Sequence, residues 1–141
     1  MLTLMLVEDN IPFRRLLKGG MLSEFPSMQV IEAGNGDEAF KELASYPIDL
    51  IFMDIRLPGE NGLELTRKIK AKHHDIPIII VTSYDLPEYR EAAIKCGAGG
   101  FIGKYSFNAE TVSAMIKCHE EAKQNGRKPI CIGFASGGVG I

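Results

Sequence analysis

Apolar residues gather in five short runs along this chain, and each run is followed by a segment with helical spacing. Three of the runs are almost continuously apolar, which is typical of parallel strands covered by helices on both faces. A more mixed run, MQVIEA, fits a strand at the edge of a sheet. The predicted strands are Leu2–Val7, Met28–Ala33, Ile48–Met53, Ile76–Val81 and Gly100–Gly103.

The segments between these runs place apolar side chains three and four residues apart, which is the spacing of one helix face. Asn10 is expected to cap the first helix, and Pro12 stands in its first turn, where proline is tolerated. A later helix is expected to open on the capping pair Asp85 and Glu88. The apolar face of the first helix is predicted to contain Phe13, Leu16, Leu17 and Met21. The other predicted helices are Asp37–Ser45, Gly62–Lys72, Asp85–Cys96 and Asn108–Gln124.

This alternation of strand and helix predicts an α/β fold. Right-handed crossovers between successive strands give a parallel sheet with helices on both faces. The length of 141 residues favours one domain, which we expect to occupy residues 1–126. Residues 127–141 (RKPICIGFASGGVGI) lie outside the pattern, and no charged side chain follows Lys128. They are expected to form a flexible tail or linker, or alternatively a short strand or docking segment.

Composition and charge exclude several classes of protein. Apolar residues make up 45% of the chain and charged residues 24%, which is ordinary for a globular domain. The net charge of −2 argues against direct nucleic-acid binding. No apolar run reaches membrane-spanning length, and the start MLTLMLVED fits a strand better than a signal peptide. The cysteines, Cys96, Cys118 and Cys131, lack metal-ligand spacing, which favours reduced thiols in a cytoplasm.

Most of the predicted strands end in side chains that can carry chemistry. Glu8 and Asp9 follow the first strand, Asp54 the third, the hydroxyl pair Thr82 and Ser83 the fourth, and Lys104 the fifth. Ligands of open α/β sheets bind beyond the carboxyl ends of the strands. We therefore expect these side chains to meet at one edge of the sheet.

Carboxylates crowded together repel one another unless a cation joins them. Their hard oxygen atoms favour Mg²⁺ or Mn²⁺ over zinc. An ammonium and a hydroxyl beside such a cation suit phosphoryl transfer, and a carboxylate is an established nucleophile for it. The apolar strand Ile48–Met53 would hold Asp54 as that nucleophile at the bottom of an acidic cleft.

Each of these residues also has a purely structural explanation when taken alone. Glu8 and Asp9 are suited to a helix N-terminus, Asp54 to a turn, and Lys104 to a solvated position. Their joint placement at matching strand ends is what predicts a site.

The motifs that carry these residues resemble the receiver domain of two-component response regulators, which has the CheY-like fold. They are LMLVEDN, LIFMDIRLPGENGLEL, IIIVTSY and GAGGFIGK, and the resemblance covers about residues 1–125. It implies a five-stranded parallel sheet in the order 2-1-3-4-5. The absence of proline after Lys104 is similar to the subfamily with helix-turn-helix output domains. We expect a trans bond between Lys104 and Tyr105, because a non-proline cis bond costs about 3–4 kcal/mol.

The resemblance implies a role for each residue of the expected site. Asp54 looks like the phospho-acceptor, and Glu8, Asp9 and Asp54 look like the carboxylates that hold Mg²⁺ or Mn²⁺, with the main-chain carbonyl of Arg56 as a further ligand. Pro58, Gly59 and Gly62 resemble the family's loop after the acceptor.

Three further residues match positions that respond to phosphorylation. Thr82 looks like the switch hydroxyl and Lys104 like the lysine that pairs with the phosphoryl group. Phe101 occupies the place of the switch aromatic, and a core aromatic is an equal interpretation of it. Tyr84 and Arg56, each two residues beyond a site residue, either overhang the site and slow attack by water or are solvated loop residues.

The resemblance implies a cytoplasmic signal receiver. A sensor histidine kinase or histidine phosphotransfer protein would supply the phosphoryl group, and the domain would catalyse its own phosphotransfer and slow autodephosphorylation without turning over a small substrate. Phosphorylation would alter the surface of the fourth helix, fifth strand and fifth helix for a partner or a homodimer, in transcriptional control. No contact with nucleic acid or membrane by this domain is expected. The alternative is an interaction or scaffold domain that is never phosphorylated.

Overall fold

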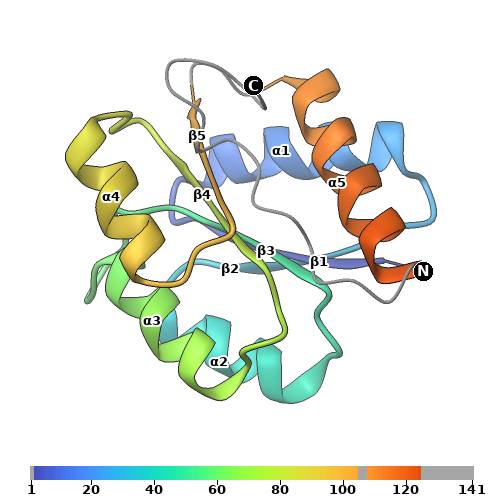
Figure 1. The fold of residues 1–141 in the computed structure, drawn as a ribbon. Helices are drawn as coiled ribbons and strands as arrows, with labels where there is room; N and C mark the ends of the chain where they lie inside the picture. Colours follow the sequence, from blue (N-terminus) through green and yellow to red (C-terminus); the bar gives the residue numbers. More distant parts are fainter. Residues whose placement is uncertain (1, 105–107, 125–141) are drawn as a thin grey trace.

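A twisted sheet of parallel strands lies between two layers of helices (Figure 1). The structure, a computed structural model, describes residues 2–104 and 108–124. The strands lie in the order β2-β1-β3-β4-β5, and every neighbouring pair is parallel, which confirms the predicted sheet. They are β1 (Thr3–Val7), β2 (Gln29–Ala33), β3 (Leu50–Met53), β4 (Ile78–Thr82) and β5 (Gly100–Gly103).

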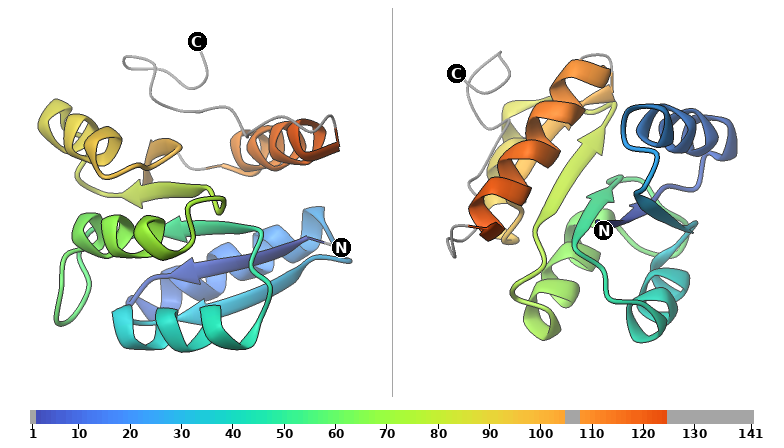
Figure 2. Two further views of the ribbon diagram at one scale, coloured as in Figure 1. Left: turned by 60° about the horizontal axis from the view of Figure 1, so that its bottom comes forward. Right: turned by 90° about the vertical axis from the view of Figure 1, so that its right-hand side faces the viewer.

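The helices divide between the two faces of this sheet. Helices α1 and α5 cover one face, and α2, α3 and α4 cover the other (Figures 1 and 2). Every helix begins near the edge where the preceding strand ends, so the strand ends and helix starts share that edge. The helices are α1 (Ile11–Glu24), α2 (Gly36–Ser45), α3 (Gly62–Lys72), α4 (Pro87–Lys95) and α5 (Ala109–Gln124).

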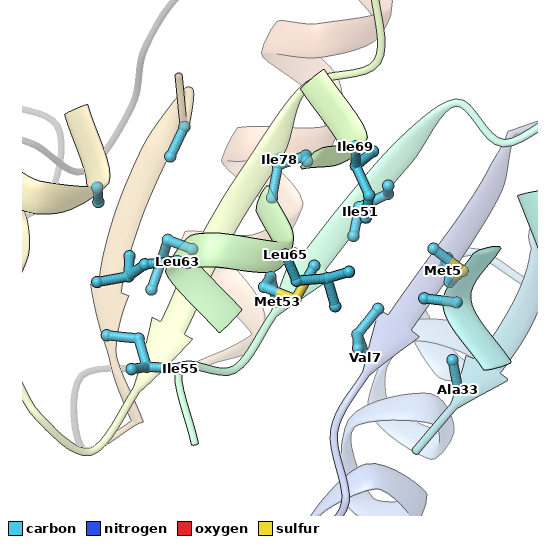
Figure 3. Packing of buried hydrophobic residues seen from close by; sticks show 14 of the residues in the cluster. Met5, Val7, Ala33, Ile51, Met53, Ile55, Leu63, Leu65, Ile69 and Ile78 are labelled. Atoms are coloured by element: carbon cyan, nitrogen blue, oxygen red, sulfur yellow. The ribbon is translucent and has the colours of Figure 1, made fainter. Parts of the chain in front are cut away.

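Strand β1 is buried on both faces and separates two apolar clusters. Successive side chains of a strand point to opposite faces. Leu4 and Leu6 accordingly pack with α1 and α5, whereas Met5 and Val7 pack with α2, α3 and α4 (Figure 3). All residues of β1 are at most 4% exposed, so the residue that follows the strand starts from a buried position.

Helix α1 follows the prediction except at one side chain. Asn10 caps it by accepting a hydrogen bond from the Phe13 N–H at 3.0 Å, and Leu17 and Met21 are buried as expected. Leu16 was predicted on the same face but is 73% exposed. It lies about 100° around the helix from Leu17, off the row that faces the core. The prediction for Leu16 is therefore wrong, because the face of α1 that the core covers is narrower than the face that carries apolar residues.

The start of α4 also differs from the prediction. The helix begins at Pro87 instead of Asp85, and Leu86 occupies the N-cap position without a side-chain cap. The carboxylate of Asp85 accepts a hydrogen bond from the Arg90 Nε at 2.8 Å. Proline suits the first position of a helix because its φ angle is already helical. Asp85 and Glu88 therefore do not cap this helix as expected, and Asp85 instead forms an ion pair with Arg90.

Some predictions fall outside the described residues. These are the tail at residues 127–141, the bond from Lys104 to residue 105, and the state of Cys131. Among the residues that are described, Cys96 and Cys118 are free thiols. The described helices include none with the length and apolar character needed to cross a bilayer.

Two glycines shape the loop between β3 and α3. Gly59 has a φ angle of +86°, in the left-handed region that favours glycine. A Cβ atom at Gly62 would lie 1.8 Å from the carbonyl oxygen of Asp54 and 3.0 Å from the Cα atom of Ile55. The Gly62 N–H also donates to the Ile55 carbonyl. The loop therefore approaches the backbone of Asp54 and Ile55 so closely that no side chain fits at position 62.

We expect Gly62→Ala to lower the free energy of unfolding by about 1–3 kcal/mol, because the added methyl group meets backbone atoms that have to shift. The matched control is Gly19→Ala in α1, where nothing lies within 4 Å of the added Cβ. That change should raise stability by about 0.5–1 kcal/mol through helix propensity. Urea unfolding of both variants measures the difference, and equal effects at the two positions would contradict the role of Gly62.

Candidate functional site

Acidic side chains from two neighbouring strands meet at one edge of the sheet. Val7 and Met53 are paired in register, and the Asp54 N–H donates to the Val7 carbonyl at 3.0 Å. Glu8 and Asp54 therefore follow adjacent strand ends at the same height. Carboxylate oxygen atoms of Glu8, Asp9 and Asp54 all lie within 4.8 Å of one another.

Lys104 reaches this cluster from the end of β5. Its Nζ atom lies 2.7 Å from Glu8 Oε1 and 3.5 Å from Asp54 Oδ2. The same Nζ atom stands 4.4 Å from the centre of the Phe13 ring. The sequence analysis expected the Lys104 ammonium near the carboxylates of Glu8, Asp9 and Asp54, but it did not predict the direct ion pair with Glu8.

Glu8 is held from several directions. Its side chain is buried, and its Oε2 atom accepts a hydrogen bond from the Asn10 N–H at 3.0 Å. Its main-chain carbonyl accepts a hydrogen bond from Arg14 at 2.7 Å, and Arg14 also pairs with Glu32 of β2 at 3.0 Å. Sequence reasoning also missed Arg14. Its place one turn into the helix after the acidic pair is the signal that points to it.

The electrostatics of Asp54 follow from its burial. The side chain is only 6% exposed, and this burial, together with the neighbouring Glu8, raises the pKa of Asp54 to about 7. Lys104 and a hydrogen bond from the Ile55 N–H at 2.8 Å act in the opposite direction and do not overcome this rise. Burial lowers the pKa of Lys104, but its hydrogen bond with Glu8 and the charge of Asp54 outweigh burial and raise it.

The carboxylates of Glu8, Asp9 and Asp54 fit a hard divalent cation. Glu8 and Asp54 are buried and Asp9 is exposed, so the cluster opens to solvent on the side of Asp9. A cation would remove the repulsion that favours protonation of Asp54, and carboxylate oxygen is the ligand that Mg²⁺ prefers. Within residues 2–104 and 108–124, no other group of three acidic, cysteine or histidine side chains has this spacing.

Thr82 and Phe101 are even less exposed to solvent than Glu8 and Asp54. Thr82 is completely buried at the end of β4, and its hydroxyl accepts a hydrogen bond from the Tyr84 N–H at 3.1 Å. Phe101 is 1% exposed and belongs to the cluster beneath α4, with the Arg90 guanidinium 5.2 Å from its ring centre. Its position in this structure is that of a core aromatic.

Arg56 and Tyr84 contact each other. The Arg56 guanidinium stacks over the Tyr84 ring at 4.6 Å, and the Tyr84 ring lies 5.8 Å from that of Tyr89 in α4. Arg56 follows Asp54 by two residues and Tyr84 follows Thr82 by two. The stack therefore joins the loops that leave β3 and β4.

A parallel sheet in the order 2-1-3-4-5, with an acidic cluster and a lysine beyond its strand ends, defines the CheY-like class of domains. Residues 4–117 match the response regulator receiver domain family. The chain belongs to that family, which confirms the resemblance seen in the sequence motifs.

Relatives of known sequence support this assignment. The chain is 33% identical to the response regulator GacA of Pseudomonas viridiflava over 67% of its length and 45% of that protein. It is 31% identical to the response regulator UvrY of Escherichia coli over 82% of its length and 53% of that protein. The chain thus spans about half the length of these relatives.

Solved structures show the same fold. The response regulator TrrA of Thermotoga maritima, in complex with Mg²⁺ and BeF, is 33% identical with a TM-score of 0.74, over 84% of this chain and 99% of that one. A CheY-like receiver domain protein from Methanospirillum hungatei has a TM-score of 0.79 at 24% identity, over 89% of this chain and 99% of that one. The second likeness speaks for the fold alone.

We expect Asp54→Asn to stabilise the metal-free protein at about pH 8 by on the order of 2 kcal/mol. The folded state holds the Asp54 proton up to a pKa of about 7, against 3.8 for an ordinary aspartate. The wild type therefore loses stability as pH rises through this window, and the variant does not. Urea unfolding in a chelator between about pH 4 and pH 8 measures the gap, which should close toward low pH.

The control for this measurement is Glu91→Gln, which changes an exposed carboxylate of α4 and should leave the pH profile unchanged. A gap between wild type and Asp54→Asn that stays constant with pH would contradict the raised pKa.

Proposed function

We propose that this domain is a phosphorylation-dependent signal receiver in which Asp54 accepts a phosphoryl group from a phosphohistidine. A sensor histidine kinase or a histidine phosphotransfer protein would present that group. The observation that carries the proposal is the cluster itself, with the Glu8, Asp9 and Asp54 carboxylates within 4.8 Å of one another and the Lys104 ammonium 3.5 Å from Asp54.

The transfer uses groups that the chain already positions. An Asp54 carboxylate oxygen forms a bond to phosphorus while the bond from phosphorus to the histidine nitrogen breaks, and that nitrogen keeps the electron pair. Mg²⁺ or Mn²⁺ bound by Glu8, Asp9, Asp54 and the Arg56 carbonyl would neutralise negative charge there. Lys104 would turn from Asp54 to a phosphoryl oxygen and balance part of the added charge.

The switch would begin at Thr82. The new phosphate adds about 1.5 to 2 negative charges at one point. The Thr82 hydroxyl would leave the Tyr84 N–H and bond to a phosphoryl oxygen, which would shift the loop that leads into α4. Phe101 already occupies the core in this structure, so the loop and α4 are the parts that we expect to move.

The output surface would lie on α4, β5 and α5. Leu86, at the N-cap of α4, is 45% exposed, and Ile94 of α4 is 55% exposed, which supports a protein-binding role for this face. We propose that it binds a partner or a second copy of the domain in the cytoplasm, in control of transcription, without direct contact to nucleic acid. The alternative is a scaffold domain that is not phosphorylated. The complete set of acids, threonine and lysine favours the receiver.

Acetyl phosphate with Mg²⁺ should add one phosphoryl group to the wild type, detected by intact mass. Asp54→Ala should take up none, because the nucleophile is gone. Asp9→Asn should be labelled at least about tenfold more slowly, because one carboxylate of the cation site is lost. Asp75→Asn, an exposed carboxylate away from the cluster, should be labelled like the wild type.

An unlabelled wild type, or equal labelling of Asp54→Ala, would defeat the receiver proposal and leave the scaffold alternative.

The stack of Arg56 on Tyr84 should lengthen the lifetime of the phosphoryl group by restricting water at the site. We expect Arg56→Ala and Tyr84→Ala each to shorten that lifetime about threefold or more, and the double variant to add little, because the two side chains act as a unit. Decay of phosphorylated protein, followed by mass, measures this. Tyr46→Ala removes an exposed aromatic elsewhere and serves as control. Unchanged lifetimes would show that Arg56 and Tyr84 are solvated loop residues.

A further inference from the structure

We propose that Phe13 is a positioning residue for Lys104, whose ammonium group rests on the face of its ring. The inference rests on the proposed function, because it concerns how Lys104 is presented to the phosphoryl group. The Lys104 Nζ atom lies 4.4 Å from the centre of the Phe13 ring. A cation at this distance from a ring face is attracted by the ring quadrupole.

The need for such a residue follows from the length of the lysine side chain. A lysine side chain has more rotamer freedom than most, and fixing it in one conformation costs conformational entropy. Lys104 is followed by tyrosine, so no proline restrains the backbone after it. The side chain is nevertheless directed inward and is only 18% exposed. Contacts made by the side chain itself therefore determine where the ammonium lies.

These contacts differ in how they respond to phosphoryl transfer. Glu8 and Asp54 hold the ammonium in this structure at 2.7 Å and 3.5 Å. In the proposed reaction both carboxylates take on other partners, Asp54 as nucleophile and Glu8 as a cation ligand. The Phe13 ring carries no charge and offers no metal ligand. It is the contact that can remain while the ammonium exchanges a carboxylate for a phosphoryl oxygen.

The ring itself is fixed by the start of α1. The Phe13 N–H donates to the Asn10 side chain at 3.0 Å, which sets the first turn of the helix. The ring packs against the cluster that contains Leu17. With Lys104 and Val112, it lines an apolar groove of about 290 Å³ between α1 and α5. Apolar surroundings weaken the hydration of the ammonium and strengthen its attraction to the ring.

The test combines a spectroscopic and a kinetic measurement on the full chain. In lysine-labelled protein, the Hε protons of Lys104 should be shifted upfield by the ring current of Phe13, and Phe13→Leu should abolish the shift. The same variant should be phosphorylated by acetyl phosphate about three- to tenfold more slowly, the range expected for loss of one such contact. In that reaction the Asp54 oxygen bonds to phosphorus and acetate leaves with the electron pair.

Two controls separate positioning from a general effect on folding. Phe13→Tyr keeps an aromatic face and should retain both the ring-current shift and the rate. Tyr46→Ala removes an exposed aromatic side chain outside this groove and should change neither. The Mg²⁺ affinity of Phe13→Leu should equal that of the wild type, because Phe13 is not among the carboxylate ligands.

The outcomes are distinguishable. An absent ring-current shift in the wild type, or an unchanged rate in Phe13→Leu, would overturn the role of Phe13 while the wild type is still labelled. A wild type that takes up no phosphate would overturn the proposed function and this inference with it.

Discussion

The arrangement of the candidate site depends on one interaction, the contact of the Lys104 ammonium group with the buried carboxylates of Glu8 and Asp54. Glu8 and Asp54 are removed from water at the ends of two adjacent strands, and like charges so placed oppose each other. Lys104 reaches both from the end of β5 and offsets part of that repulsion. Burial and the remaining repulsion from Glu8 keep the Asp54 pKa high. A cation bound by the same oxygen atoms would relieve that repulsion.

The sheet makes this convergence unavoidable. Because β1 and β3 pair in parallel register, their last residues stand at the same height, and the acids that follow them are neighbours. β5 lies further along the sheet, so only a long side chain from its end can reach β1. The lysine side chain at position 104 has this length, and its ammonium group reaches Glu8. The strand order and the residue type are thus two parts of one constraint.

The fold was accessible from the sequence because its parallel strands are short and nearly all apolar. The order of the strands came from resemblance to a family, since periodicity alone does not order strands within a sheet. Of the residues predicted at the strand ends, Glu8, Asp9 and Lys104 do come together around Asp54. Periodicity misplaced Leu16, because an apolar stripe on a helix can be wider than the face that the core covers.

Contacts between side chains of distant segments were the part that sequence reasoning missed. The pairing of Lys104 with Glu8, its contact with Phe13 and the tie from Arg14 to Glu32 each join residues from different elements. The helix start at Asp85 failed for a related reason, because an ion pair with Arg90 occupies the expected capping group. Local patterns of residues do not contain this information.

The close return of Gly62 onto the backbone of Asp54 makes one part of the surroundings of Asp54 less tolerant of substitution than the rest. At position 62 the carbonyl oxygen of Asp54 leaves no room for a side chain, so this position favours glycine. In the loops that leave β3 and β4, the neighbouring groups are instead the side chains of Arg56 and Tyr84, which contact each other. Under the proposed function, substitutions of Arg56 and Tyr84 would change how long a phosphoryl group stays on Asp54, whereas the acceptor and the backbone around it would stay the same.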